Sequence, residues 1–92
     1  MIKSFRHKGI QQFFETGSKA SIAAEHEAKL ARQLMLLNAV NGPLEMDIAG
    51  WKLQQLKGEL AEHWAVKVNG NWRLTFTFEG EDAILVDYQD YH

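Results

Sequence analysis

Basic and polar side chains in the second half of the chain could together hold and cleave a phosphodiester. Arg73 lies within an alternating apolar segment, Lys67 precedes it, and Lys52 and Lys57 come shortly before both. The chain ends on 90–92, Asp-Tyr-His, which adds an acid, an aromatic ring and a group that titrates near neutral pH. In RNA the substrate's own 2′-hydroxyl is the nucleophile, so a protein needs only a base, an acid and cations for the phosphorane charge. This residue set therefore fits RNA cleavage.

Other kinds of site lack the residues that they require. The chain has no Cys, which excludes a disulfide framework, a thiolate nucleophile and a Cys-ligated metal. Its four histidines do not stand at metal-ligand spacing with one another or with acids on one helix face; they are His7, His26, His63 and His92. There is no glycine-rich phosphate loop and no serine nucleophile motif. We expect neither a metal nor another cofactor.

Each candidate residue also has a structural interpretation. An Arg at the centre of a sheet face is unusual unless it meets an anion, and for Arg73 a phosphate and the Asp87 carboxylate are equally good partners from position alone. Any single Lys is most often a solvated surface charge. A C-terminal Asp-Tyr-His is by default a frayed tail without a role.

The hydropathy pattern predicts two N-terminal helices. An apolar turn over 10–14 ends at Gly17-Ser18, and a longer helix from about Ser21 ends at Asn41-Gly42-Pro43. Ser18 or Ser21 is expected to cap the longer helix. Two adjacent apolar stripes are expected to pack as one broad face; they are Ala24, Ala28, Ala31 and Met35, and Ala23, Leu30, Leu34 and Leu37.

Strict alternation predicts a meander of three strands after the helices. The predicted strands cover 64–68, 72–78 and 83–88, and the predicted turns are 69–71 and 79–82. Outside this meander, Ile2–Phe5 is compatible with an edge strand. Residues 44–50 are irregular, and residues 51–58 are expected to form a short extended connection. We expect Arg73, Thr75, Thr77 and Lys67 to lie on the open face of the sheet, and His26 and His63 to lie on the protein surface. The residues expected in the core are Trp64, Val66, Val68, Trp72, Leu74, Phe76, Phe78, Ile84, Val86 and Tyr88. The fold class is therefore α+β, with two N-terminal helices packed on one face of a small antiparallel sheet.

Length and charge limit the classes of function. The 92 residues are one domain, 1–92, with 46% hydrophobic residues and a formal net charge of −2. That charge argues against a protein that coats nucleic acid unaided. The charge is uneven, because residues 51–78 carry a net +2 and residues 79–92 a net −5. A short start without an apolar run and the absence of any membrane-length apolar stretch predict a cytoplasmic protein without membrane contact.

The sequence resembles the HigB-type toxins of bacterial toxin–antitoxin modules, within the RelE/ParE superfamily. The resemblance covers nearly the whole chain and is carried by 1–5 (MIKSF), 52–53 (KL), 56–58 (LKG), 64–76 (WAVKVNGNWRLTF) and 86–92 (VDYQDYH). The Trp-Arg-Leu strand is moderately specific, since related ParE-like gyrase poisons carry similar strands. Its combination with a terminal Asp-Tyr-His is strong.

The resemblance implies a RelE-like microbial ribonuclease fold and a toxin that cuts mRNA in the ribosomal decoding site. It implies a helix-turn-helix, HigA-like antitoxin as partner, with operator DNA reached only through that antitoxin. The implied catalytic residues are Arg73, which contacts the scissile phosphate, and the tail Asp90, Tyr91 and His92; the implied RNA-binding residues are Lys52, Gln54, Lys57 and Lys67.

One departure from the family pattern leaves alternatives open. Some members have His where this chain has Gln54, which cannot titrate, so an acid or base role there must pass to His92 or Asp90. One alternative to an endoribonuclease is a ParE-like poison of DNA gyrase, which would leave the terminal Tyr-His without a role. The other is a catalytically inert partner of a DNA-binding antitoxin, which the presence of Gln54 in place of His suggests.

Overall fold

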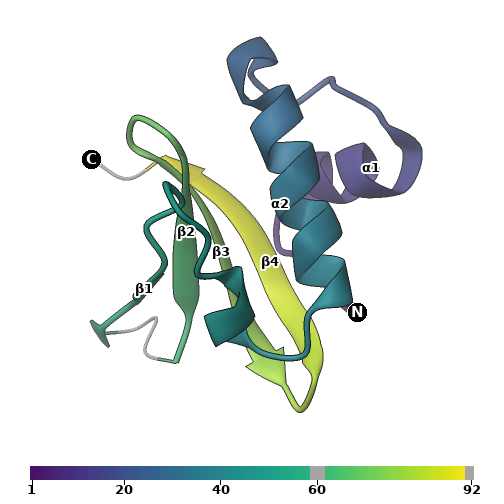
Figure 1. The fold of residues 1–92 in the computed structure, drawn as a ribbon. Helices are drawn as coiled ribbons and strands as arrows, with labels where there is room; N and C mark the ends of the chain where they lie inside the picture. Colours follow the sequence, from purple (N-terminus) through teal and green to yellow (C-terminus); the bar gives the residue numbers. More distant parts are fainter. Residues whose placement is uncertain (59–61, 91–92) are drawn as a thin grey trace.

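The computed structural model describes residues 1–58 and 62–90, which form two helices and a four-stranded antiparallel sheet (Figure 1). The elements are α1 (Lys8–Thr16), η1 (Ala24–His26), α2 (Glu27–Ala39), η2 (Pro43–Met46), β1 (Gln54–Gln55), β2 (Trp64–Asn69), β3 (Trp72–Glu79) and β4 (Asp82–Asp90). The sheet order is β1-β2-β3-β4, and both helices lie on one side of it. The α+β prediction is confirmed, although η2 falls in a stretch that we expected to be irregular.

Strand β3 is the centre of the sheet, and its alternation separates the two faces. Leu74 and Phe76 are fully buried on the face that α2 covers, together with Val66 of β2 and Tyr88 of β4. Arg73 points to the opposite, open face. The partners of β3 are in antiparallel register on both sides, so its position is fixed by pairing as well as by burial.

Helix α1 ends as the sequence indicates, whereas α2 does not begin as predicted. Gly17 closes α1 in the left-handed conformation, and its amide donates to the carbonyl of Phe13. Neither Ser18 nor Ser21 caps the longer helix: the N-cap of η1 is Ala23, that of α2 is His26, and neither makes a side-chain cap bond. The 3-10 turn η1 takes the place of the first α-helical turn.

Only one of the two predicted apolar stripes of α2 packs on the sheet. Leu30, Leu34 and Leu37 are buried, together with Gln33. The Ala24, Ala28, Ala31 and Met35 stripe is exposed, and the side chain of Met35 is 70% exposed. This face is turned away because the sheet is narrow and covers one side of the helix only.

Both edges of the sheet are covered by other parts of the chain. The N-terminal segment runs parallel to β4, with Ile2 opposite Ala83 and Phe5 opposite Val86, which confirms the expected edge strand as two isolated bridges. At the other edge, β1 pairs only with residues 64–65 of β2. Farther along β2, the amide of Lys67 donates to Trp51 O (2.7 Å), and Gln33 Nε2 donates to Lys67 O (2.8 Å). The outward backbone groups of Lys67 are therefore satisfied.

A bulge in β4 changes which residues face the core. Thr77 pairs with Ile84 and Thr75 with Asp87, so β4 has one residue more than β3 between these pairs, and Leu85 there adopts φ 56°. Ile84 consequently lies on the face of Thr77, and its predicted alignment with Val86 and Tyr88 is wrong. The Leu85 amide donates to Ser4 Oγ at 2.9 Å, which supports the bulge from the N-terminal segment.

We predict that Ser4→Ala destabilises the protein through this bulge. The substitution leaves the Leu85 amide without its partner, which costs about 1–2 kcal/mol for a part-buried donor. Urea unfolding measures the loss. The control is Ser21→Ala, because Ser21 is exposed and caps no helix, and we expect it to change the free energy of unfolding by less than about 0.5 kcal/mol. Equal effects of the two changes would contradict the role of Ser4.

Candidate functional site

The strand register gathers the predicted polar residues in two rows on the open face of the sheet. The first row runs Lys67, Arg73, Gln89 across β2, β3 and β4. The second row, one step along the strands, runs Gln54, Ala65, Thr75, Asp87 across all four. Ala65 and Thr75 are buried even on this face, with 0% and 2% exposure, so the accessible polar groups are the longer side chains around them. Neighbouring members of a row are about 5 Å apart.

The Arg73 guanidinium is held by backbone carbonyls of the β2–β3 turn. Its Nη1 donates to Gly70 O at 2.9 Å and to Trp72 O at 3.1 Å. Gly70 adopts φ 57° in this turn, at the position where the sequence predicts a hairpin connection. Among the described residues Nε and Nη2 have no hydrogen-bond partner, so one side of the fork remains available to an anion.

Asp87 does not neutralise Arg73. One carboxylate oxygen of Asp87 accepts from the amide of Tyr88 (2.8 Å) and the other from Gln89 Nε2 (2.7 Å). Within 1–58 and 62–90 no carboxylate lies within ion-pair distance of the guanidinium. The ion pair between Arg73 and Asp87, one of the two alternatives that the sequence position allowed, is therefore not formed.

The other predicted RNA-binding residues are placed at different distances from Arg73. Lys67 is directly opposite Arg73, and Lys52 follows Trp51, whose carbonyl accepts from the Lys67 amide. Gln54 is exposed on the open face, in the second row. Lys57 follows the end of β1 and the residue Leu56, whose amide donates to His63 O just before β2. Lys57 therefore lies toward the end of the sheet that is remote from the β2–β3 turn.

The C-terminal end of β4 arrives beside Arg73. Asp90 pairs with Trp72, the residue before Arg73, and Figure 1 shows the end of β4 next to the β2–β3 turn. The side chain of Asp90 is exposed, and the pairing with Trp72 places it on the helix side of the sheet, whereas Gln89 is the residue opposite Arg73 on the open face. Tyr91 and His92 lie outside the described residues, and their catalytic roles stay predictions.

An aromatic cluster lies behind this end of the sheet, on the helix side. The rings of Trp72 and Tyr88 stack with centroids 4.5 Å apart, and the Tyr88 hydroxyl is hydrogen-bonded to Nδ1 of His26 at 2.5 Å. His7 meets the edge of Tyr88. His26 is only 3% exposed, so its predicted surface position is wrong, whereas the core position of Tyr88 is confirmed. The cluster fixes the backbone from which Arg73 and Asp90 extend.

Two basic residues outside the predicted site extend the positive charge near Lys67, with Lys29 close to Lys67 and Arg32 close to Lys29. Both belong to α2, and burial, followed by the charges of Lys67 and Arg32, lowers the pKa of Lys29 below its ordinary value. The sequence places these residues in a net acidic segment, and only the packing of α2 against the edge of β2 brings them to Lys67. No local pattern could have revealed that proximity.

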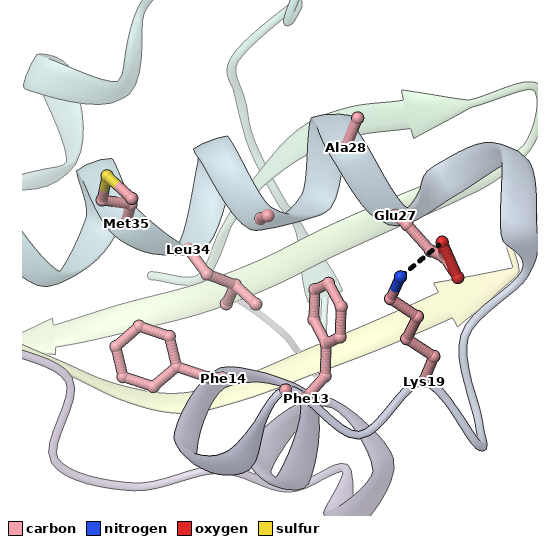
Figure 2. A pocket seen from close by; sticks show the side chains of 9 residues that line it. Phe13, Phe14, Lys19, Glu27, Ala28, Leu34 and Met35 are labelled. Carbon is pink, nitrogen blue, oxygen red and sulfur yellow. Dashed lines mark ion pairs between the residues drawn. The ribbon is translucent and has the colours of Figure 1, made fainter.

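A separate apolar groove of about 550 Å³ lies between the two helices (Figure 2). Phe13 and Phe14 of α1 face Leu34 and Met35 of α2, and an ion pair between Lys19 and Glu27 closes one end. None of the lining residues comes from the sheet, so the groove is distinct from the open face.

Among the described residues no group of three His, Asp or Glu side chains is placed to bind a metal ion. No helix in the described part of the chain is long and apolar enough to cross a bilayer.

Comparison with solved structures defines the class of fold. The chain is similar over its full length to the YoeB–YefM complex from Staphylococcus aureus, with a TM-score of 0.65, 17% sequence identity and 98% of that chain covered. A heterotetrameric YoeB–YefM toxin–antitoxin complex from the same organism matches equally well. At this identity the likeness establishes a shared fold, one that bacterial toxin–antitoxin complexes use.

Sequence comparison then gives the family. Residues 3–92 match the model of the RelE-like toxin of the type II toxin–antitoxin system HigB. The chain is also 36% identical over 92 residues to Endoribonuclease HigB of Proteus vulgaris, and the alignment covers all of both chains. This chain belongs to the HigB-like toxin family, as the resemblance in its strands and C-terminus indicates.

We predict that the buried Tyr88 makes folding stability depend on alkaline pH. Burial raises the pKa of Tyr88 above its ordinary 10.0, a hydrogen bond with the Ala23 backbone partly opposes this, and the charge of Glu25 adds to it. The folded state thus favours the neutral phenol, so its contribution is complete below pH 10 and is lost as the pH rises through the folded pKa.

Urea unfolding between pH 8 and pH 11 tests this against Tyr88→Phe. The wild type should lose free energy of unfolding more steeply above pH 10 than the variant, because lysines titrate equally in both. The variant itself should be less stable at neutral pH by about 1–3 kcal/mol, since buried His26 loses its partner. Parallel alkaline slopes in the two proteins would exclude Tyr88 as the titrating group.

Proposed function

We propose that this chain is an endoribonuclease toxin that cleaves mRNA engaged on the ribosome, with Arg73 bound to the scissile phosphate. The observation that carries the proposal is the Arg73 guanidinium, fixed by two turn carbonyls and without a carboxylate partner among the described residues. Membership of the HigB-like family and full-length similarity to Endoribonuclease HigB of Proteus vulgaris support the activity.

The reaction follows from the chemistry of RNA. The 2′-oxygen attacks phosphorus, the bond to the 5′-oxygen breaks, and a 2′,3′-cyclic phosphate and a 5′-hydroxyl result. A base takes the proton of the 2′-hydroxyl and an acid returns one to the leaving oxygen. Arg73, with Lys67 opposite it, stabilises the charge that gathers on the phosphorane oxygens. Asp90 and His92 are the proposed acid and base, and Tyr91 is proposed to stack on a base or orient the phosphate.

A ribosome-bound substrate is consistent with the charge of the chain. The net charge of −2 gives little general attraction to RNA, so we infer only a few contacts, at Lys67 opposite Arg73 and at Lys52 and Gln54 farther toward the β1 edge. A ribosome that presents the message removes the need for wider contacts. Lys57, which the register places farther away, is proposed to contact a flanking part of the RNA.

An antitoxin is the proposed protein partner. Two solved structures that share this fold are complexes of YoeB with YefM, described as a toxin–antitoxin pair. We infer that a HigA-like, helix-turn-helix antitoxin holds this chain inactive in the cytoplasm, and that the chain reaches operator DNA only through it. The toxin itself is not proposed to bind DNA.

Arg73→Ala should lower mRNA cleavage by about 100-fold or more, because one preorganised cation at the reacting phosphate is removed. Arg73→Lys keeps the charge but loses the fork geometry, so we expect partial activity. The measurement is mapping of mRNA 5′ ends in cells after induction, in the presence and absence of ribosome engagement. The matched control is Lys3→Ala, an exposed cation at the opposite edge of the sheet, which should cleave normally.

The same experiment separates the alternatives. Intact mRNA together with DNA damage would replace the ribonuclease by a gyrase poison. Harmless overexpression in a sensitive host without antitoxin would favour an inert partner, for which Gln54 is the motive. Undiminished growth arrest from both Arg73→Ala and His92→Ala would overturn the assigned roles.

A C-terminal tag should impair activity and leave folding unchanged. Strand β4 carries the chain as far as Asp90 beside Trp72, so residues added after His92 extend directly from the proposed site. The free energy of unfolding should match that of an N-terminally tagged protein, and only the cleavage rate should fall. Full toxicity of the C-terminally tagged chain would argue against a catalytic tail.

A further inference from the structure

A row of positive charge continues from the proposed site around the edge of β2 onto α2. Lys67 is opposite Arg73 in the sheet, and Gln33 of α2 donates to the Lys67 carbonyl at 2.8 Å. Lys29 lies one helical turn before Gln33 and therefore on the same side of α2, with Arg32 beside it. We name Lys67, Lys29 and Arg32 the edge cluster.

The edge cluster has no ion-pair partner among the described residues. The ion pairs among the described residues are Met1 with Asp82 and Lys19 with Glu27, and neither involves the cluster. Burial, followed by the charges of Lys67 and Arg32, lowers the pKa of Lys29, so Lys29 lies within electrostatic reach of the other two cations. Gln33 adds a buried acceptor, Oε1, which has no hydrogen-bond partner in the described part of the chain. Like charges gathered without an acid are unfavourable for folding, so the arrangement is explained best by an anionic partner.

We propose that Lys29 and Arg32, through Lys67, bind the sugar–phosphate backbone of the same RNA strand whose phosphate is bound at Arg73. This inference rests on the proposed function and extends it by several nucleotides. The cluster begins at Lys67, about 5 Å across the sheet from Arg73, and continues onto α2 through the Gln33 contact, so it offers further cationic contacts to the same strand.

The chemistry of the edge cluster favours RNA over an acidic protein. Its members are flexible point charges and a guanidinium, and Lys is depleted where proteins bury an interface. The exposed apolar residues of α2 are on the groove side, where Met35 is one turn after Arg32, and none of them lies on the side of Lys29. Because phosphate contacts carry no base identity, the cluster should hold RNA of any sequence.

The test is Lys29→Gln/Arg32→Gln, measured by fluorescence anisotropy with labelled RNA whose 2′-hydroxyls are methylated and which therefore cannot be cleaved. The variant should bind a ten-nucleotide RNA about tenfold more weakly at low salt. The slope of log affinity against log salt should become less steep by about 1.4, as expected for two lost phosphate contacts on a single strand. Binding of a three-nucleotide RNA should not change.

The matched control is Lys3→Gln/Lys8→Gln. It removes the same charge from exposed residues near the opposite edge of the sheet, and it should leave the ten-nucleotide affinity within about twofold. The thermal midpoint of Lys29→Gln should be equal to or above that of the wild type, because a lowered Lys29 pKa means that its charge opposes folding. If Lys29→Gln/Arg32→Gln is unfolded, it will show no thermal midpoint. RNA binding is then measured with the single variant Lys29→Gln.

Failure of this inference differs from failure of the proposed function. Equal ten-nucleotide affinities of the test and control variants, with wild-type cleavage intact, would overturn the edge cluster alone. Loss of ribosome binding without any change for free RNA would assign these cations to ribosomal RNA, and loss of binding to an acidic antitoxin alone would assign them to protein. Both results contradict the proposal. If the wild type cleaves no mRNA in cells, the proposed function fails first.

Discussion

The alternation of β3 is the constraint on which the rest of the structure depends. Leu74 and Phe76 are fully buried under α2, and β3 is paired on both sides. A slip of one residue would turn Arg73 into the core and move these two side chains into water, which hydrophobic burial and the cost of an unpaired buried charge both forbid. The core therefore sets the position of Arg73, and the pairing of β3 sets what stands beside it.

Coverage of the two sheet edges explains why so small a domain presents its site at one end. Beside β4, the N-terminal segment satisfies Ala83 and Val86 and supports the bulge at Leu85. At the β2 edge Gln33 and Trp51 satisfy Lys67. What remains open is the face near the β2–β3 turn, where the end of β4 and Arg73 meet. The aromatic cluster of Trp72, Tyr88 and His26 stiffens this end from behind.

Local patterns in the sequence predicted most of the fold and the face of the sheet on which Arg73 lies. The alternation over 64–68 and 72–78 gave the strands and the face of Arg73, and residues 69–71 gave the turn that now holds its guanidinium. Features set by packing between distant segments were not predicted. The bulge that moves Ile84, the burial of His26 under Tyr88 and the exposure of Met35 each depend on a partner far along the chain. The same holds for the approach of α2 to Lys67.

Charge placement connects folding to the proposed function. The acids of this chain outnumber its bases, yet neither Arg73 nor the edge cluster is paired with one of them in the described residues. Asp87 could have neutralised Arg73, but its oxygens are engaged by the Tyr88 amide and by Gln89. Holding that acid in place keeps the guanidinium open to a phosphate, at the cost of the stabilisation that an internal ion pair would give. A lowered Lys29 pKa shows the same balance in α2, because the fold keeps a cation where its charge is unfavourable. Such positions are expected where binding of an anion, rather than stability of the free protein, determines which residue is retained.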